Sequence, residues 1–243
     1  RCNDRLRCRS LLAACALAVP ALAGGVLALL LRRLPEPEGF ALEEREGPLV
    51  QIGRVLAYPW AVAVVVIAAV EGAVILGFLT FLAPSLESDG FSPAVAGLAV
   101  GLYGLAVLGW TRAVKLVSDR LGPAALILIG GGLLALGYAS GALGQSLASV
   151  GIAAVLVGGG FAFMHSTLQT WATEVVPEAR ATVISLFAAA LFAGSAVATM
   201  AAAPLAEAGS FNVLFALGAL AAVPLGLFAG LARHRYSGNR RQS

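Results

Sequence analysis

Residues 60–83 read WAVAVVVIAAVEGAVILGFLTFLA, and the only charged residue in this run is Glu71. The run exceeds the roughly 20 residues that an α-helix needs to cross about 30 Å of hydrocarbon. Its apolar residues follow one another continuously, without the alternation that marks the strand of a membrane barrel. Because a backbone in lipid must satisfy its own hydrogen bonds, we predict a transmembrane helix here.

Six further runs have the same character, and together they predict an all-α, polytopic membrane helix bundle. Of the 243 residues, 59% are hydrophobic and 12% are charged, whereas about 25% of the residues in an average soluble domain are charged. The additional predicted spans are about 11–31, 93–111, 123–141, 147–169, 181–204 and 211–232.

Basic residues beyond the run at 60–83 gather in alternate loops, and this pattern predicts the orientation of the bundle. The loops at roughly 84–92, 142–146 and 205–210 contain no Lys or Arg. Loops rich in Lys and Arg stay in the cytoplasm, so the other loops and the tail are predicted to be cytoplasmic. Their basic residues are Arg112, Lys115, Arg120, Arg180, Arg233, Arg235, Arg240 and Arg241.

The chain divides into four predicted segments. An N-terminal segment with the first span (1–31) precedes a linker (32–58), the six-span bundle (59–232) and a cytoplasmic tail (233–243). The linker holds four arginines, five glutamates and three prolines, and its arginines predict a cytoplasmic position. For residues 41–47 a helix lying on the membrane surface is the alternative, with its length limited by the prolines on both sides.

The first ten residues depart from the charge rule. With the linker in the cytoplasm they would lie outside, yet they contain four arginines. The chain begins with Arg1, and its only methionines are Met164 and Met200. We therefore interpret the sequence as a piece of a longer protein, in which preceding residues override the local charge.

Glu71 lies in the middle of its predicted span, with apolar neighbours on both sides. A carboxylate at this depth costs on the order of 3 kcal/mol or more, so it should face the bundle interior or a wet cavity. We expect Glu71 to carry a coupling proton or to contact a substrate. The alternative is a structural role, in which a protonated Glu71 hydrogen-bonds a neighbouring helix.

Three further polar or aromatic residues are candidates for lining a substrate cavity: Tyr103, His165 and Gln169. His165 and Gln169 are one helical turn apart, so we expect them to share a face, and histidine changes its charge near neutral pH. The alternative is that this pair hydrogen-bonds between helices. Trp110, seven residues after Tyr103, is interpreted as part of the interfacial aromatic belt.

Closely spaced glycines predict tight contacts between helices. They occur at Gly97, Gly101 and Gly104, at Gly137 and Gly141, and at 158–160. Small residues at such spacing let helix backbones approach each other. This suits helices that rock against one another, and it suits static packing equally well.

Two predicted cytoplasmic loops carry recognisable patterns. The first reads KLVSDRLGP over 115–123 and contains Asp119, Arg120 and Gly122. A carboxylate where a helix starts can bind the N-terminal amides or a loop arginine and so latch one conformation. The alternative is that the two charges of this loop merely fix topology.

The second loop reads HSTLQTWATEVVPEARATVISLF over 165–187 and contains Glu174, Pro177 and Arg180. With these two loops the chain resembles the C-terminal half of the major facilitator superfamily, specifically its drug/proton antiporter type. The first loop is similar to the family's G-x-x-x-D-R-x-G-R pattern, and the second to its P-E-x-R-G/A-T pattern. Two positions depart from the first pattern, because Lys115 replaces its first glycine and Pro123 its last arginine.

The resemblance implies that the first span corresponds to helix 6, the linker to the central cytoplasmic loop and the last six spans to helices 7–12. It implies secondary active transport by alternating access, with proton-coupled efflux of a small molecule across a bacterial plasma (inner) membrane. The implied partners are the lipid bilayer, the substrate, protons and an N-terminal half-bundle that precedes this chain.

Other function classes find little support in the sequence. No Ser-His-Asp, HExxH or phosphate-loop pattern is present, so we do not expect an enzyme or a cofactor. The three cysteines lack metal-ligand spacing, so no metal is expected. The cations do not form one basic face, which argues against nucleic-acid binding. The remaining alternatives are a membrane scaffold protein without transport and a non-functional remnant of a transporter.

Overall fold

The computed structural model describes residues 47–240, and every structural statement below concerns these residues. The predicted span at 11–31 and most of the predicted linker lie outside them. Within the described part every regular element is helical, and six helices are long and apolar enough to cross a membrane. The predicted all-α membrane bundle with six spans after the linker is therefore confirmed for this part of the chain.

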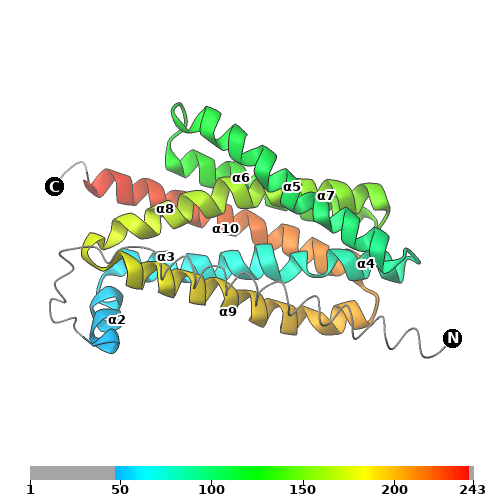
Figure 1. Cartoon of the computed structure of the whole chain (residues 1–243), viewed down its shortest axis with the longest axis horizontal. Helices are drawn as coiled ribbons and strands as arrows, with labels where there is room; N and C mark the ends of the chain where they lie inside the picture. The colour runs from blue at the N-terminus through cyan, green and yellow to red at the C-terminus, as the bar shows by residue number, and fades with distance from the viewer. Residues whose placement is uncertain (1–46, 241–243) are drawn as a thin grey trace, which may run out of the picture. The chain divides into compact units, whose positions relative to one another are not determined.

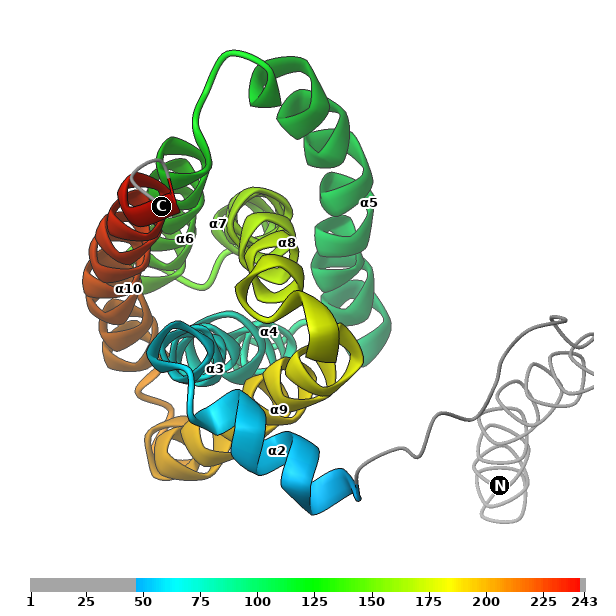
Figure 2. The same cartoon turned by 90° about the vertical axis from the view of Figure 1, so that its left-hand side faces the viewer.

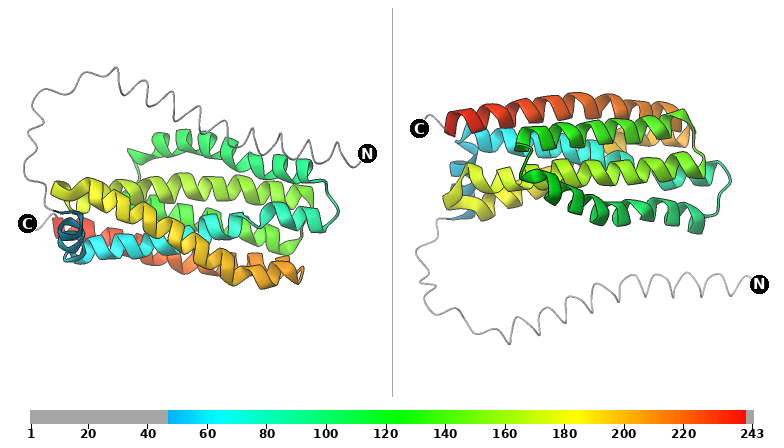
Figure 3. Two further views of the ribbon diagram at one scale, coloured as in Figure 1. Left: turned by 60° about the horizontal axis from the view of Figure 1, so that its bottom comes forward. Right: turned by 90° about the horizontal axis from the view of Figure 1, so that it is seen from above.

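The elements follow one another as antiparallel spans (Figures 1 and 3). A short helix, α2 (Pro48–Leu56), precedes the first span. The spans then comprise α3 (Pro59–Gly72) with the π-helix η1 (Ala73–Gly77) and α4 (Leu82–Ser88); α5 (Pro93–Ser118); α6 (Pro123–Leu143); α7 (Leu147–Gly160) with the π-helix η2 (Phe161–His165) and α8 (Ser166–Val175); η3 (Pro177–Ala179) with α9 (Arg180–Glu207); and α10 (Phe211–Arg240).

Local sequence signals set the starts of several spans. Pro59, Pro93 and Pro123 each occupy the first helical position, where the missing N–H costs nothing and the fixed φ suits a helix. The Ser92 hydroxyl accepts a bond from the backbone N–H of Val95 and so caps α5. These caps keep the connections between the spans short.

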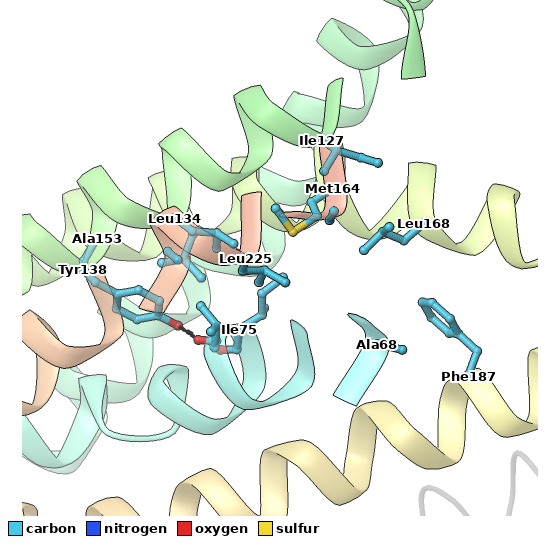
Figure 4. Close-up of a cluster of buried hydrophobic side chains, with 14 of the residues drawn as sticks. Ala68, Ile75, Ile127, Leu134, Tyr138, Ala153, Met164, Leu168, Phe187 and Leu225 are labelled. Carbon is cyan, nitrogen blue, oxygen red and sulfur yellow. Dashed lines mark hydrogen bonds between the residues drawn. The ribbon is translucent and has the colours of Figure 1, made fainter. Parts of the chain in front are cut away.

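The spans pack in four main pairings, which are easiest to follow in the end-on view of Figure 2. α6 lies along both α10 and α7, α5 lies along α7, and α3 lies along α9. The α6–α10 pair is very close: a Cβ added at Gly131 would stand 2.7 Å from the Cα of Gly226. Buried side chains from all these helices meet in one core (Figure 4), including Ile75, Leu134, Tyr138, Met164, Phe187 and Leu225.

Several helices extend beyond the predicted spans. Arg112 and Lys115, predicted in a loop, lie on α5, which runs to Ser118. Arg233, predicted in the tail, lies on α10 and is 6% exposed. The apolar run marks the part of a helix inside the hydrocarbon, but backbone hydrogen bonding continues beyond it, to Ser118 in α5 and to Arg240 in α10. Long basic side chains at its end reach the interface.

The predicted linker also contains regular structure, since α2 occupies Pro48–Leu56. Among the glycines predicted to bring helices together, Gly137 and Gly141 do pack against neighbouring helices. Gly97, Gly101 and Gly104 have no atoms near their Cβ positions within the described residues. That face of α5 is therefore open in this bundle.

Candidate functional site

Glu71 and His165 form a buried pair in the centre of the bundle. His165 Nδ1 lies 3.3 Å from Glu71 Oε2. The Glu71 side chain is fully buried and that of His165 is 14% exposed. The second carboxyl oxygen of Glu71, Oε1, is buried without a hydrogen-bond partner in the described residues. The glutamate predicted to face the interior is thus joined to one of the predicted cavity residues.

Both residues of the pair lie beside a π-helical turn. η1 begins two residues after Glu71, and η2 ends at His165 itself. A π turn shifts backbone bonding from i+4 to i+5 and is found mostly as single turns, frequently at functional sites. In the second span, the hydroxyls of Ser166 and Thr167 donate to the carbonyls of Ala162 and Phe163 inside η2. Such bonds back to the helix tend to bend it.

Close backbone contact brings α9 against the turn that carries Glu71. A Cβ at Gly72 would overlap the main chain of Leu191, and a Cβ at Gly194 would overlap the main chain of Ala69. Only glycine fits at these two positions of the α3–α9 crossing. The crossing therefore fixes the position of Glu71 along the α3 axis relative to α9.

Aromatic rings surround the imidazole of His165. The Phe161 ring stacks on it at 4.4 Å between centroids with an interplanar angle of 13°. Phe187 from α9 lies 5.6 Å away, and Tyr103 from α5 contacts Phe161 edge-on at 6.1 Å. Glu71, Tyr103, His165 and Phe187 thus bring the first, second, fourth and fifth described spans to one place.

Gln169, the fourth predicted member, does not join this group. It is exposed on α8, whereas the His165 side chain is only 14% exposed. Trp110, interpreted as part of the interfacial belt, donates from its indole Nε1 to the Val155 carbonyl at 3.1 Å. This bond links α5 to α7.

A second polar cluster ties three helices together at one end of the bundle. Arg233 on α10 donates to Glu174 on α8 at 3.0 Å, and Tyr236 donates to the Glu174 carbonyl at 3.1 Å. The guanidinium of Arg233 also lies over the rings of Trp171 and Tyr236, at 5.5 and 5.2 Å. Trp60 from α3 packs on both rings. We call these five residues the end cluster.

The other predicted loop residues are exposed. Asp119 is the C-cap of α5, Arg120 follows it, and Gly122 is the N-cap of α6. Within residues 47–240 no side-chain hydrogen bond or ion pair involves Asp119 or Arg120. Pro177 opens the 3-10 turn η3, and Arg180 is the first residue of α9. The described structure therefore pairs Glu174 with Arg233 and leaves the first loop's charges in solvent.

Some residues of these two clusters were missed by the reading of the sequence. Arg233 was counted among the tail charges, although it directly follows the apolar run at 211–232. Gly72 and Gly194 were not singled out, although Ala68 and Gly72 have small-xxx-small spacing. Phe187 and Tyr138 could not be recognised from the sequence, because the same aromatic residues occur in functional sites and in hydrophobic cores. Among the described residues no group of His, Cys, Asp and Glu is placed to hold a metal ion.

The fold and the site define a class: a multi-pass membrane helical bundle with an ionisable pair buried at its centre. The family comparison agrees, because the model of the Major Facilitator Superfamily matches residues 12–199 and, in a second placement, residues 115–243. The chain belongs to the Major Facilitator Superfamily, which implies secondary transport across a membrane. No curated protein matches the sequence.

Proposed function

We propose that this protein is a proton-coupled secondary transporter, which moves a small molecule outward by alternating access while protons enter. The observation that carries the proposal is the buried contact between Glu71 and His165 at 3.3 Å. An ionisable residue inside a membrane bundle marks a substrate or proton pathway by default. Here two such residues from different spans meet, and one oxygen of the carboxyl lacks a partner.

The pair is suited to exchange protons because its geometry accommodates several protonation states. A neutral imidazole has one donor and one acceptor nitrogen, and a protonated carboxyl has one O–H donor. Glu71 can therefore accept from His165 when it is ionised, or donate to Nδ1 when it holds the proton. No side chain has to move between these states. A proton-coupling site needs this tolerance, since it must be stable both loaded and empty.

Exposure supports His165 as the entry to Glu71. The imidazole has 14% of its side chain exposed, whereas Glu71 has none. A proton that reaches the carboxyl by way of the imidazole needs no water beside the glutamate. Deprotonation leaves a charge in an apolar interior, which is costly. A rearrangement that exposes Glu71 to water or to a cationic substrate would relieve that cost and so couple the proton to transport.

The end cluster supports a role in holding one conformation. Arg233 and Glu174 join α10 to α8, while the α5–α6 turn lies beside the C-terminal part of α10. We place this end in the cytoplasm of a bacterial cell, together with α2, since basic residues cluster there. In this proposal Asp119, Arg120 and Arg180 face the N-terminal half-bundle that completes the transporter, and Asp119 latches one state.

A transport assay in everted membrane vesicles, with this chain joined to the N-terminal half-bundle that completes the transporter, tests this function. Acidification of the vesicle lumen should drive uptake of the probe ethidium, followed by its fluorescence, and a protonophore should abolish the uptake. Glu71→Gln keeps the shape of the side chain but cannot release a proton, so it should lower gradient-driven uptake at least tenfold. Equal uptake by the variant and the wild type, or no uptake by either beyond vesicles without the protein, would contradict the proposal.

A static scaffold is the second candidate, because the fixed contact between Glu71 and His165 is also what a purely structural pair would show. This reading predicts that Glu71→Gln alters stability or partner binding and leaves proton-driven movement of any probe at background. Thermal unfolding of the same variant in detergent, measured beside the vesicle assay, separates the two functions.

A further inference from the structure

Tyr138 reaches from α6 into the π turn that follows Glu71. Its hydroxyl lies 2.6 Å from the carbonyl oxygen of Val74 and 2.9 Å from that of Ile75. Both carbonyls belong to η1. Tyr138 is fully buried, and Figure 4 shows its hydroxyl pointing toward Ile75 within the cluster of buried side chains.

This contact has a physical reason in the bonding of a π turn. In an α-helix each of these carbonyls would accept from the residue four positions later, and in η1 that pattern is broken. The Ile75 carbonyl accepts from the backbone N–H of Phe78, three residues later, and each buried carbonyl oxygen has a second lone pair that a further donor can use. The Tyr138 hydroxyl supplies such a donor at Val74 and Ile75, while the Thr80 hydroxyl donates to the carbonyl of Gly77 at the end of η1. The bond from Tyr138 therefore favours the π turn over the regular helix.

The ring of Tyr138 is held so that its hydroxyl cannot easily point elsewhere. Phe215 stacks on it with an interplanar angle of 9°, and Phe78 packs on it at 5.8 Å between centroids. A Cβ at Gly218 would stand 3.2 Å from the rings of both Phe78 and Tyr138. The surrounding rings thus hold the hydroxyl in place against η1.

The π turn in turn decides where Glu71 points. Gly72 and η1 follow Glu71 directly, so the number of residues in that turn sets the rotation of α3 relative to the rest of its span. Glu71 meets His165 only at the observed rotation, with Gly72 packed on α9. A change at η1 therefore reaches the carboxyl through the backbone, without any contact between Tyr138 and Glu71.

We propose that Tyr138 is a positioning residue: its bond to the Val74 and Ile75 carbonyls holds the π turn that aims Glu71 at His165. The inference rests on the proposed function, because it takes the Glu71–His165 pair as the proton site. It adds α6 to the two spans that carry Glu71 and His165 as a helix that determines how the pair binds protons.

The test measures proton binding directly, in purified protein in lipid nanodiscs. Infrared difference spectra across a pH series report the carboxyl C=O stretching band of Glu71, which is assigned by its absence in Glu71→Gln. The apparent midpoint is determined for the wild type, for His165→Asn and for Tyr138→Phe. Tyr138→Phe should displace the midpoint by at least half a pH unit, in the same direction as His165→Asn, because both weaken the contact within the pair.

Hydrogen exchange of residues 73–79 is followed in the same samples and should be at least tenfold faster in Tyr138→Phe. Tyr236→Phe is the matched control, since it removes a hydroxyl that donates to a main-chain carbonyl of another helix at the end cluster. It should leave both the Glu71 midpoint and the exchange at 73–79 at their wild-type values. An equal displacement by Tyr236→Phe would overturn the proposal, since the effect would then not be specific to η1.

A Glu71 midpoint in Tyr138→Phe equal to that of the wild type also overturns the inference and leaves the proposed function intact. Loss of the Glu71 band change in the wild type itself would instead count against the proposed function. If Tyr138→Phe does not fold, 3-fluorotyrosine at position 138 takes its place. This residue keeps the ring and donates a stronger hydrogen bond, so it should displace the midpoint in the opposite direction. An unchanged midpoint again overturns the inference.

Discussion

The pairing of α6 with α10 and the pairing of α3 with η2 use the same membrane environment in opposite ways. Gly131 and Gly226 bring α6 and α10 into backbone contact, among apolar side chains such as Leu134 and Leu225. In the centre of the bundle, Glu71 and His165 meet, each beside a π turn, and one carboxyl oxygen has no hydrogen-bond partner in the described residues. One interface consists of close packing alone, and the other contains a costly polar contact.

The difference separates stability from function within one bundle. Helices in lipid gain little from burying apolar surface and associate through close packing and interhelical hydrogen bonds. The α6–α10 interface is held by close packing of this kind, so it does not need ionisable groups. The Glu71–His165 contact costs stability and is explained by what it does. Substitutions should therefore act on folding at the first interface and on proton coupling at the second.

The largest expected effect is that of Gly131→Leu, which forces a side chain into the backbone of α10. Overpacking a filled interior costs about 1–3 kcal/mol and sometimes more, so we expect little folded protein. Folded yield in detergent, measured by size-exclusion chromatography, checks this. Gly132→Leu is the control, because the neighbouring glycine has open space at its Cβ position. Equal yields from the two variants would show that α6 and α10 are not closely packed.

Arg233→Gln should have the next largest effect, because it removes the guanidinium that donates to Glu174 and that lies over the ring of Trp171. The loss of one partner from a partly buried pair costs about 1–3 kcal/mol. Unfolding by sodium dodecyl sulfate in mixed micelles measures it. Arg235→Gln, an exposed neighbour on α10, should change the free energy of unfolding by no more than about 0.5 kcal/mol. A cost that is equal for both arginines would mean that the end cluster does not stabilise the bundle.

Glu71→Gln should have a smaller effect on stability, in contrast to its effect on transport. Glutamine keeps the shape of the side chain and a group that can hydrogen-bond His165, and it buries no charge, so we expect the free energy of unfolding to stay equal or to rise by about 1 kcal/mol. The same micelle titration applies. A clear loss of stability would indicate that this contact holds the bundle together, and the contrast between the two interfaces would disappear.

The smallest effect is expected from Gly97→Ala on the open face of α5. Alanine has a higher helix propensity than glycine by about 1 kcal/mol at most, and nothing lies near the added methyl group in the described residues. Thermal unfolding should therefore be unchanged or slightly improved. Gly137→Ala is the comparison, since its Cβ would stand 3.0 Å from Val157, and it should destabilise. A large loss from Gly97→Ala would show that another helix covers this face in the intact protein.

Much of the fold could be predicted from the sequence, because lipid imposes a simple rule on the backbone. Long apolar runs had to be helices, and six of them appear with the expected order. The ends were less predictable: Arg112, Lys115 and Arg233 lie on helices, since hydropathy reports the depth of the hydrocarbon and not the last hydrogen-bonded residue. The residues of α2 were included in a linker for the same reason, as their composition is mixed.

The sequence allowed several residues of the site to be predicted, but not how they are arranged relative to one another. Glu71 stood out because a lone carboxyl in an apolar run is costly, and His165 and Tyr103 were selected as polar groups within spans. Their meeting at one place depends on which helices are neighbours, and hydropathy holds no information on that. Gln169 was grouped with His165 by α-helical spacing, but the spacing does not report how far a side chain reaches into the bundle, and Gln169 is exposed. Arg233 as the partner of Glu174 likewise depends on tertiary packing.

The two π turns give each of their spans a property that the amino-acid composition does not record. Every residue of an α-helix advances the helix by about 100°. Deleting a single alanine, valine or leucine between 73 and 77 would thus leave hydropathy and span length almost unchanged, yet it would turn the Glu71 side chain about a quarter of a circle relative to the outer part of its helix. Chain length within these short stretches is therefore under tighter constraint than residue identity, and an insertion or a deletion there should be more damaging than most substitutions.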